Sequence, residues 1–168
     1  MSVLLCAAVG LAQAPKAVKK APPQFSILRP NAAPLPLSHY RGKVVALTFI
    51  STLCSHCQAL TIQLNPIASE YAPRGVQFLE CAINDGAEGG LTTFVNKFQP
   101  SFPVGWSPRE AMASFLGISQ MDMEDFFVPH MVFLDRAGNI RGNFEPGTAF
   151  YQNPPANIRA ELDKLLKK

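Results

Sequence analysis

The sequence predicts an α/β domain in which helices flank both faces of a central mixed β-sheet. Apolar runs typical of strands alternate with helical stretches, two late strands are joined by a tight turn, and an amphipathic helix closes the chain. With 168 residues, 48% of them hydrophobic, the chain is long enough for one domain with a sizeable core.

The first half of this pattern reads strand, helix, strand. The run at 44–50 is apolar along both faces, which predicts a buried central strand. Apolar side chains at helical spacing then predict a helix from Gln58 to about Tyr71, which Pro73-Arg74-Gly75 ends. A second strand is expected at 76–83.

The second half contains shorter elements, each predicted from local spacing or turn residues. In order, we expect a helix at about 91–98, an extended piece at 102–104, a helix from Pro108 to about Leu116, strands at 131–134 and 140–144 joined by the turn 135–139, and a helix at about 155–166. The last helix carries an apolar face, which predicts that it packs against the sheet.

The N-terminal 36 residues differ in composition from the rest. Residues 1–14 form a signal-like segment, because the apolar run at 3–12 leads to the small-x-small pattern Ala12-Gln13-Ala14. We therefore expect export to the periplasm or another extracytoplasmic space; a truncated signal and lipidation at Cys6 stay open as alternatives. Residues 15–36 carry six prolines and read as a Pro/Ala-rich lead-in, in which the stretch 25–28 is expected to pair as a short edge strand.

The charge pattern limits the classes of partner that we expect for this chain. The formal net charge is +3, only 16% of the residues are charged, and the basic residues are scattered apart from small groups near the two ends. No basic stripe of the kind that binds nucleic acid is present, so we expect no nucleic-acid partner.

Cys54-Ser55-His56-Cys57 is the strongest chemical signal in the chain. It follows the strand at 44–50 and opens a helix, where unpaired N–H groups favour a thiolate at Cys54. Cys57 lies one turn further on the same helix face, from which it can attack a mixed disulfide. A structural disulfide would gain little from so short a loop, and a zinc site would need a second Cys/His pair, which the sequence lacks. The motif therefore predicts thiol–disulfide exchange.

Several further motifs occur in the order found in TlpA-like thioredoxin-fold proteins of the redoxin group, which this sequence resembles. They are Tyr40-Arg41-Gly42-Lys43-Val44-Val45, the C-x-x-C, Phe102-Pro103-Val104, Val128-Pro129 and Phe133-Leu134-Asp135-Arg136-Ala137-Gly138-Asn139-Ile140. The resemblance implies a thioredoxin-like domain over residues 37–168, with Cys54 as the exposed nucleophile and Cys57 as the resolving thiol. It also implies that Pro129 is a cis-proline facing the disulfide, and that Val128 and its neighbours bind a partner's extended chain.

The sequence departs from this family at the positions that handle protons. The thioredoxin-type acid of the preceding strand is replaced by Thr48, and a glutamate found three residues past the second cysteine is replaced by Leu60. We therefore expect the charge nearest Cys54 to come from His56 and the helix terminus. Without these acids, the direction of electron flow stays open.

Three side chains near the motif have both an ordinary and a functional interpretation. His56 is either a solvated residue of the first helical turn or a cation that stabilises the thiolate of Cys54 and so makes the disulfide a better oxidant. Cys81 is expected to fill the core, with a second resolving cysteine as the alternative. His130, after the cis-proline, is either an ordinary polar residue at the start of a strand or a group near the cysteines that tunes the thiolate, contacts substrate or completes a copper site.

The leading hypothesis is a monomeric thiol–disulfide oxidoreductase that acts on protein thiols and disulfides through Cys54 and Cys57, without cofactor or metal. A thiol peroxidase of the peroxiredoxin type is the alternative, although Leu47 and Ser51 stand where such enzymes carry a proline and a threonine. A thioredoxin-fold copper carrier is a third possibility, for which His130 offers the only additional ligand.

Overall fold

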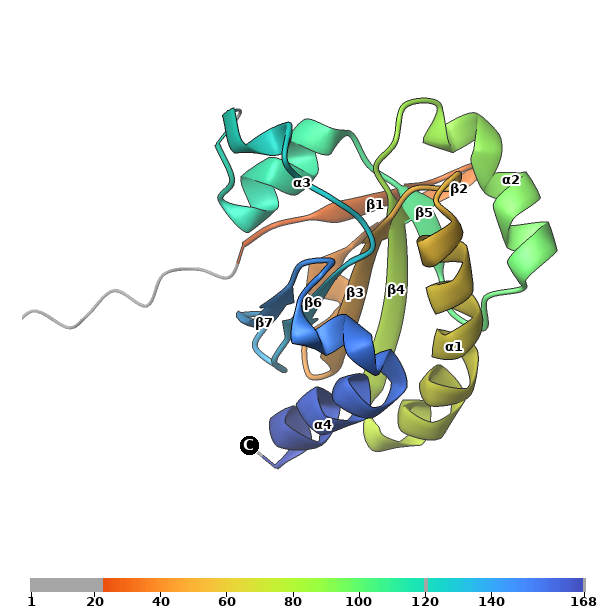
Figure 1. Cartoon of the computed structure of the whole chain (residues 1–168). Coiled ribbons are helices and arrows are strands. Elements are labelled where there is room, and N and C mark those ends of the chain that lie inside the picture. The colour runs from red at the N-terminus through yellow and green to blue at the C-terminus, as the bar shows by residue number, and fades with distance from the viewer. Residues whose placement is uncertain (1–22, 120, 168) are drawn as a thin grey trace, which may run out of the picture.

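The computed structural model describes residues 23–119 and 121–167, and the signal-like segment expected at 1–14 lies outside this range. A sheet of seven strands forms its centre, in the order β2-β1-β5-β4-β3-β6-β7 (Figure 1). In chain order, the strands are β1 (Ser26–Arg29), β2 (Ala32–Pro36), β3 (Val44–Ile50), β4 (Val76–Ala82), β5 (Val104–Trp106), β6 (His130–Leu134) and β7 (Ile140–Phe144).

The sheet is mixed, as the sequence predicts. β3 runs parallel to β4 and antiparallel to β6, and β4 runs parallel to β5. β6 and β7 form the predicted antiparallel pair, while β1 is antiparallel to both β5 and β2. Every residue of β3 is buried, which confirms the prediction of a central strand covered on both faces.

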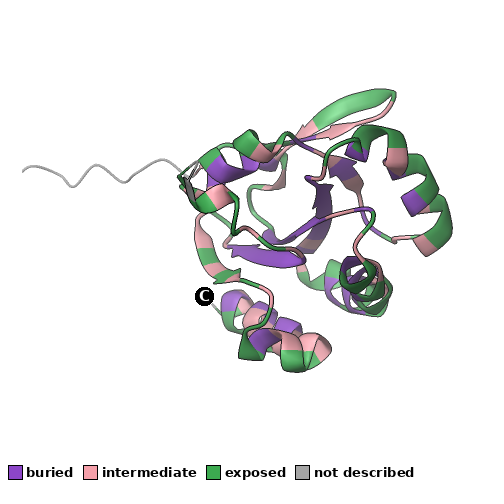
Figure 2. Cartoon of the chain, turned by 45° about the horizontal axis from the view of Figure 1, so that its top comes forward, coloured by how far each residue is buried: buried purple, intermediate pink, exposed green. Residues whose placement is uncertain are grey.

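Helices cover both faces of the sheet (Figure 1). The described residues contain α1 (Ser55–Tyr71), α2 (Ala87–Phe98), α3 (Arg109–Leu116) and α4 (Pro154–Leu166), with short 3₁₀ segments that include η1 (Leu37–Tyr40), η2 (Ala72–Arg74), η3 (Met121–Met123) and η4 (Ala149–Gln152). Alternate residues of β3 point to opposite faces: Val44 and Ala46 pack under α1 and α4, whereas Val45 and Leu47 pack with α3. Figure 2 shows the result as buried strands enclosed by helices whose outer surfaces are exposed.

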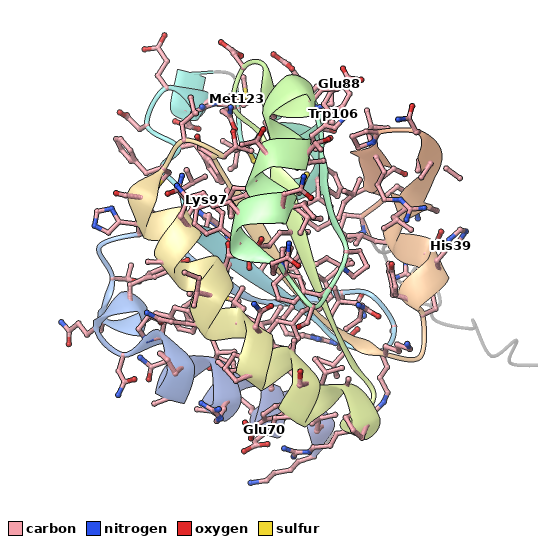
Figure 3. All side chains as sticks on the ribbon, turned by 90° about the vertical axis from the view of Figure 1, so that its right-hand side faces the viewer. His39, Glu70, Glu88, Lys97, Trp106 and Met123 are labelled. Carbon is pink, nitrogen blue, oxygen red and sulfur yellow. The ribbon has the colours of Figure 1, made fainter. Side chains whose placement is uncertain are left out.

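The face under α1 positions the cysteine motif. Leu60, Leu64, Ile67 and Tyr71 are buried at helical spacing and hold α1 against the sheet. At its far end α1 is tied to α4, because Glu70 pairs with Arg159 at 2.7 Å; Figure 3 shows Glu70 at this edge of the molecule. The motif at the other end of α1 is therefore carried by a helix that is anchored along its length.

Three elements differ from the sequence-based expectation. The stretch expected as an edge strand, β1, lies second from the edge, since β2 lies outside it. β5 pairs with β1 closely because it carries Gly105, where any side chain would collide with the Leu28 carbonyl. The helix expected at 91–98 begins at Ala87, and the extended piece expected at 102–104 is a strand from Val104.

The early start of α2 has a physical reason. Two of its residues, Gly89 and Gly90, disfavour a helix by propensity, which is why the sequence suggests a later start. A Cβ atom at Gly90 would lie 3.2 Å from Thr52 Oγ1, so glycine lets α2 approach the loop before Cys54.

Within residues 23–119 and 121–167, no helix combines the length and apolar character that crossing a bilayer requires.

Candidate active site

Cys54 occupies the N-cap position of α1, at the junction predicted for a reactive thiol. Its Sγ accepts a hydrogen bond from the backbone N–H of Cys57, with an S···N distance of 3.4 Å. The side chain is half-buried, so solvent and a partner molecule can reach the sulfur. An N–H directed at Sγ, together with the positive end of the helix dipole, stabilises a thiolate at this position.

The loop before Cys54 is held from two sides. Asn84, which follows β4, accepts a hydrogen bond from the Thr52 N–H through Oδ1 at 3.0 Å. The Gln58 side chain, on the first turn of α1, donates to the Thr52 carbonyl oxygen at 2.9 Å. These contacts fix the backbone that presents the Cys54 sulfur.

Cys57 lies behind Cys54 and is fully buried. It packs with Ile50 of β3, Ala82 of β4 and Leu91 of α2. Burial raises the pKa of the Cys57 thiol far above its ordinary value. Both cysteines are free thiols in this structure, and only Cys54 is accessible to an external disulfide.

The Val128–Pro129 peptide bond is cis, as the sequence predicts. The Val128 carbonyl oxygen lies 3.8 Å from the Cys54 sulfur and can accept a hydrogen bond from the thiol. Two segments 74 residues apart in the chain therefore meet at the nucleophile. The chain neighbours of these two residues, Leu53 and Phe127, are apolar and 82% and 66% exposed, so apolar surface is available close to the sulfur.

A groove of about 380 Å³ runs alongside this junction. It is lined by residues of α1, the cis-proline segment, the loop after β7, η4 and the start of α4. These residues are His56, Ala59, Leu60, Gln63, Val128, Pro129, Pro146, Gly147, Tyr151 and Pro154. The imidazole of His56 is exposed at this groove. Three of the predicted site residues, His56, Val128 and Pro129, are thus brought together beside Cys54.

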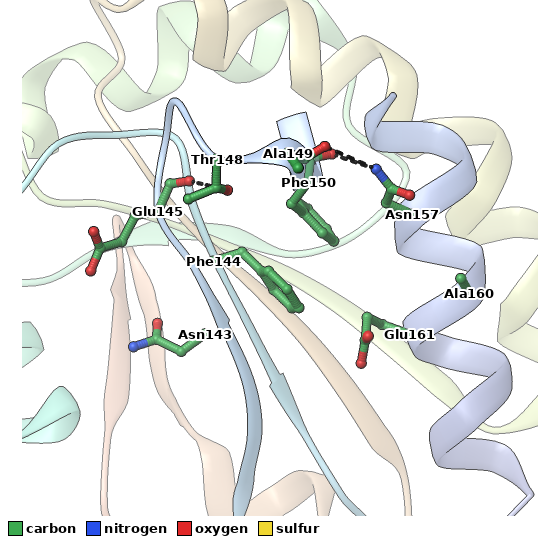
Figure 4. Close-up of a pocket in the computed structure, with 9 residues that line it drawn as sticks. All are labelled: Asn143, Phe144, Glu145, Thr148, Ala149, Phe150, Asn157, Ala160 and Glu161. Atoms are coloured by element: carbon green, nitrogen blue, oxygen red, sulfur yellow. Dashed lines mark hydrogen bonds between the residues drawn. The ribbon is translucent and has the colours of Figure 1, made fainter. Parts of the chain in front are cut away.

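A larger cavity, of about 480 Å³, lies between β7, η4 and α4 (Figure 4). The stacked rings of Phe144 and Phe150 lie on one side of it, with centroids 4.1 Å apart, and Glu161 and Asn157 project from α4. None of its lining residues is a cysteine or histidine. This cavity therefore lacks a redox-active side chain, and the groove beside Cys54 is the candidate site.

His130 does not lie where the sequence suggests. It pairs across the sheet with Phe49 and stacks on Phe126 at 4.6 Å, on the α3 side of the sheet. Its Nε2 is hydrogen-bonded to the Asn143 side chain, and burial lowers the pKa of the imidazole below its ordinary value. Because α1 covers the opposite face, the side chain of His130 is turned away from Cys57, which corrects the expected proximity to the cysteines.

No copper site accompanies this arrangement in the part of the chain that the structure describes. Among these residues, no group of three His, Cys, Asp or Glu side chains is placed to hold a metal ion. The thiol of Cys81 is buried on β4 and packs with Phe49 and Leu79, as expected of a core residue, and burial raises its pKa.

Glu80 is a site residue that no sequence motif marks. It is fully buried on β4, at the register position next to Thr48 of β3 and beneath α1. Its Oε1 lies 2.9 Å from Thr61 Oγ1, and this hydroxyl also lies 3.0 Å from the Cys57 carbonyl oxygen. Burial raises the pKa of the Glu80 carboxyl from its ordinary 4.5 to about 8. The available signal was an acid in a strand that is otherwise apolar on this face.

Comparisons with known proteins identify thiol–disulfide oxidoreductases as relatives of this chain. A thiol-disulfide oxidoreductase named ResA from Oceanobacillus iheyensis is 28% identical over 94 residues, which make up 56% of this chain and 48% of that protein. The match thus spans about half the length of the relative.

Solved structures show the same fold. A thiol:disulfide interchange protein of the thioredoxin family from Chlorobium tepidum aligns with a TM-score of 0.69 at 19% identity, over 90% of this chain and 99% of that one. A structure described as a putative protein disulfide isomerase from Bacteroides thetaiotaomicron aligns with a TM-score of 0.69 at 20% identity, over 88% and 89% of the two chains. The fold is therefore thioredoxin-like.

The family comparison covers most of the chain. The Redoxin family matches residues 16–150, a range that contains the cysteine motif, Glu80 and the cis-proline. Because this match covers most of the chain and includes the C-x-x-C motif, the chain belongs to the Redoxin family.

Proposed function

We propose that this chain is a thiol–disulfide oxidoreductase that exchanges disulfides with extended segments of other proteins. The observation that carries the proposal is the arrangement of Cys54, whose half-buried sulfur caps α1 and faces the Val128 carbonyl, with Cys57 buried behind it. One thiol is accessible for attack and the second is shielded until a mixed disulfide forms.

The exchange proceeds in two steps. The Cys54 thiolate attacks a partner disulfide, so that an S–S bond forms between Cys54 and one partner sulfur while the other sulfur leaves as a thiolate. Cys57 then loses its proton and attacks the Cys54 sulfur, which closes the Cys54–Cys57 disulfide and releases the second partner thiol. Two electrons pass from the dithiol to the partner, and the reverse sequence oxidises a partner dithiol.

The surroundings of Cys54 favour a protein partner over a small molecule. An extended chain can lie along the groove and contact the Val128 backbone, while Leu53 and Phe127 supply apolar contact area beside the sulfur. The reaction needs no cofactor or metal, and the chain acts as a monomer in this proposal. An extracytoplasmic location fits the signal-like segment at 1–14 and the use of a disulfide.

The function is tested by measuring two reactions with the full chain. We expect it to accelerate the reduction of a protein disulfide, such as those of insulin, with dithiothreitol as the electron source. Hydrogen peroxide should be consumed at only a slow rate, because Leu47 and Ser51 replace the residues that cradle peroxide in peroxiredoxins. Fast peroxide consumption without protein-disulfide reduction would establish the peroxidase alternative instead.

A groove variant sharpens this test. Ala59 is exposed on α1 within the groove, so Ala59→Trp should slow reduction of the protein disulfide while reaction with a small disulfide such as cystine is maintained. Ala111→Trp, at an exposed position of α3 outside the groove, is the matched control. Equal slowing of both substrates by the Ala59 variant would argue against docking of a protein chain in the groove.

His56 is expected to tune the redox potential. A positive charge in the first turn of α1 stabilises the thiolate and hence the reduced form, which raises the potential. His56→Pro should therefore lower the potential by tens of millivolts, since about 30 mV corresponds to 1.4 kcal/mol. A glutathione redox titration measures this shift, with His39→Asn, an exposed histidine of η1, as the control. An unchanged or higher potential in His56→Pro would make His56 a surface residue without influence on the dithiol.

A further inference from the structure

A buried polar cluster lies beneath α1, next to the resolving cysteine. It consists of Thr48, Thr61 and Glu80, all of them fully buried. Thr48 and Glu80 are adjacent on β3 and β4, and Thr61 lies one helical turn after Cys57. The layers on either side are apolar, with Ala46 and Phe78 below and Ile50 and Ala82 above.

The hydrogen bonds of this cluster depend on whether Glu80 carries a proton. Thr61 Oγ1 has one hydrogen but two acceptors nearby, the Cys57 carbonyl oxygen at 3.0 Å and Glu80 Oε1 at 2.9 Å. If Glu80 is protonated, it can donate to Thr61, which then donates to Cys57. If Glu80 is charged, Thr61 must turn its hydrogen to the carboxylate. The Thr61 hydroxyl therefore links the charge of Glu80 to the backbone of Cys57.

The charged form of Glu80 is poorly accommodated. Among the described residues, Glu80 Oε2 and Thr48 Oγ1 have no hydrogen-bond partner, although both are buried. A carboxylate with one unpaired oxygen, buried between apolar layers, costs more free energy than the neutral acid. This cost raises the pKa of Glu80 to about 8. A proton acceptor works best when its pKa lies near the working pH, so this value suits a reaction close to neutral pH.

Cys57 of α1 is the titratable group coupled to this carboxyl. Burial is the main cause that raises the pKa of the Cys57 thiol; the neighbouring Cys54 raises it further, and the negative charge of Glu80 adds a smaller effect in the same direction. Of the other elements packed here, β3, β5 and β6 present Thr48, Val104 and Met131, which do not titrate. Tyr151 of η4 is coupled to Cys57, and burial raises the pKa of its phenol, so it stays neutral through the same pH range.

We propose that Glu80 is the proton acceptor for Cys57 in the resolving step, supplied by β4 in place of an acid at Thr48 or Leu60. The inference rests on the proposed exchange function and assigns a residue to its second step. When Cys57 attacks the mixed disulfide, its thiol proton passes to the Glu80 carboxylate, and its sulfur forms the bond to Cys54. The partner sulfur leaves with the electron pair of the broken bond, and Glu80 later returns its proton to solvent.

The experiment follows the two steps separately in one reaction. Reduced full-length protein carrying Cys6→Ser, which removes the cysteine outside the described residues, is mixed with Ellman's reagent. Attack by Cys54 releases the first coloured thiolate, and attack by Cys57 on the resulting mixed disulfide releases the second. Buried Cys81 does not contribute in the native protein.

Glu80→Gln should leave the first phase unchanged and slow the second by about 100-fold at neutral pH, the range typical for loss of a proton acceptor. The second phase of the parent protein should show an inflection near pH 8, and the variant should lose it. Glu88→Gln, an exposed acid at the start of α2 (Figure 3), should leave both phases unchanged.

A rescue variant separates proton transfer from structural support. Glu80→Gln combined with Thr48→Asp returns an acid to the same layer from the neighbouring strand, and should recover much of the second phase and its pH dependence. A second phase that is unaffected by Glu80→Gln would overturn the proposal, as would equal slowing of both phases or a double variant as slow as Glu80→Gln. Absence of the first phase in the parent protein would instead reject the exchange function itself.

Discussion

Cys57→Ser is expected to accumulate mixed disulfides with other proteins, whereas Cys54→Ser should accumulate almost none. The reason is the difference in access between the two sulfurs. Cys54 is half-buried at the start of α1, while Cys57 is fully buried among Ile50, Ala82 and Leu91. Of the cysteines in the described ranges, only Cys54 has a sulfur that can meet a partner disulfide first. Without Cys57 the resulting mixed disulfide cannot be resolved. Both variants therefore also carry Cys6→Ser.

The measurement is non-reducing electrophoresis after acid quenching of extracts that contain each variant. Both variants should lose catalysed reduction of a protein disulfide down to the uncatalysed background. Cys81→Ser is the control, because its sulfur packs in the core with Phe49 and should neither trap partners nor alter exchange. Trapping of equal strength by both variants, or trapping that disappears with Cys81→Ser, would contradict the roles given to the two active-site cysteines.

The elements that the sequence predicts well are those determined by local pattern. The strand at 44–50 and the helix to Tyr71 follow from hydrophobic periodicity, which records burial directly. The accessible and buried positions of Cys54 and Cys57 follow from one turn of a helix whose first residues lie at the edge of the core. Even the cis bond before Pro129 was predictable, although from family resemblance rather than periodicity.

The features that escaped prediction depend on contacts between distant segments. Only the sheet register puts Glu80 beside Thr48, so the loss of an acid on β3 appeared uncompensated from the sequence. The facing direction of His130 likewise depends on its partner, Phe49, across the sheet. The sequence predicts too late a start for α2, because glycine at position 90 is unfavourable by helix propensity, whereas in the fold it allows a close approach to Thr52.

The second large effect concerns stability rather than catalysis. Glu80→Gln should make the reduced protein more stable than the parent at alkaline pH, by an amount that grows as pH rises. The parent's carboxyl has its pKa raised from 4.5 to about 8 on folding, so the folded state binds a proton that the unfolded state has lost. Its stabilising contribution is fully present below pH 4.5 and is lost as pH rises through 8. Glutamine mimics the protonated acid and does not titrate, so the variant lacks this dependence.

The expected difference in unfolding free energy between the parent and Glu80→Gln is large for a single side chain. Between pH 5 and pH 9, the parent should lose about 4 kcal/mol of unfolding free energy relative to Glu80→Gln, at 1.36 kcal/mol per pH unit over roughly three units. A domain of this kind has about 5–15 kcal/mol in total, so the difference is readily measured. Urea unfolding of the reduced proteins at a series of pH values gives it directly, and groups that titrate equally in both proteins cancel.

Glu88→Gln again provides the control, because an exposed carboxylate exchanges one hydrated state for another on folding and should show no growing difference with pH. If the curves for Glu80→Gln and the parent stay parallel from pH 5 to pH 9, then Glu80 is charged at neutral pH and its proton is not held by the fold. If they diverge as expected, the carboxyl beneath Cys57 holds a proton near neutral pH and releases it in the range where a resolving thiol needs an acceptor. The same divergence would show that this arrangement lowers the stability of the reduced protein as pH rises, because the carboxylate formed there remains buried.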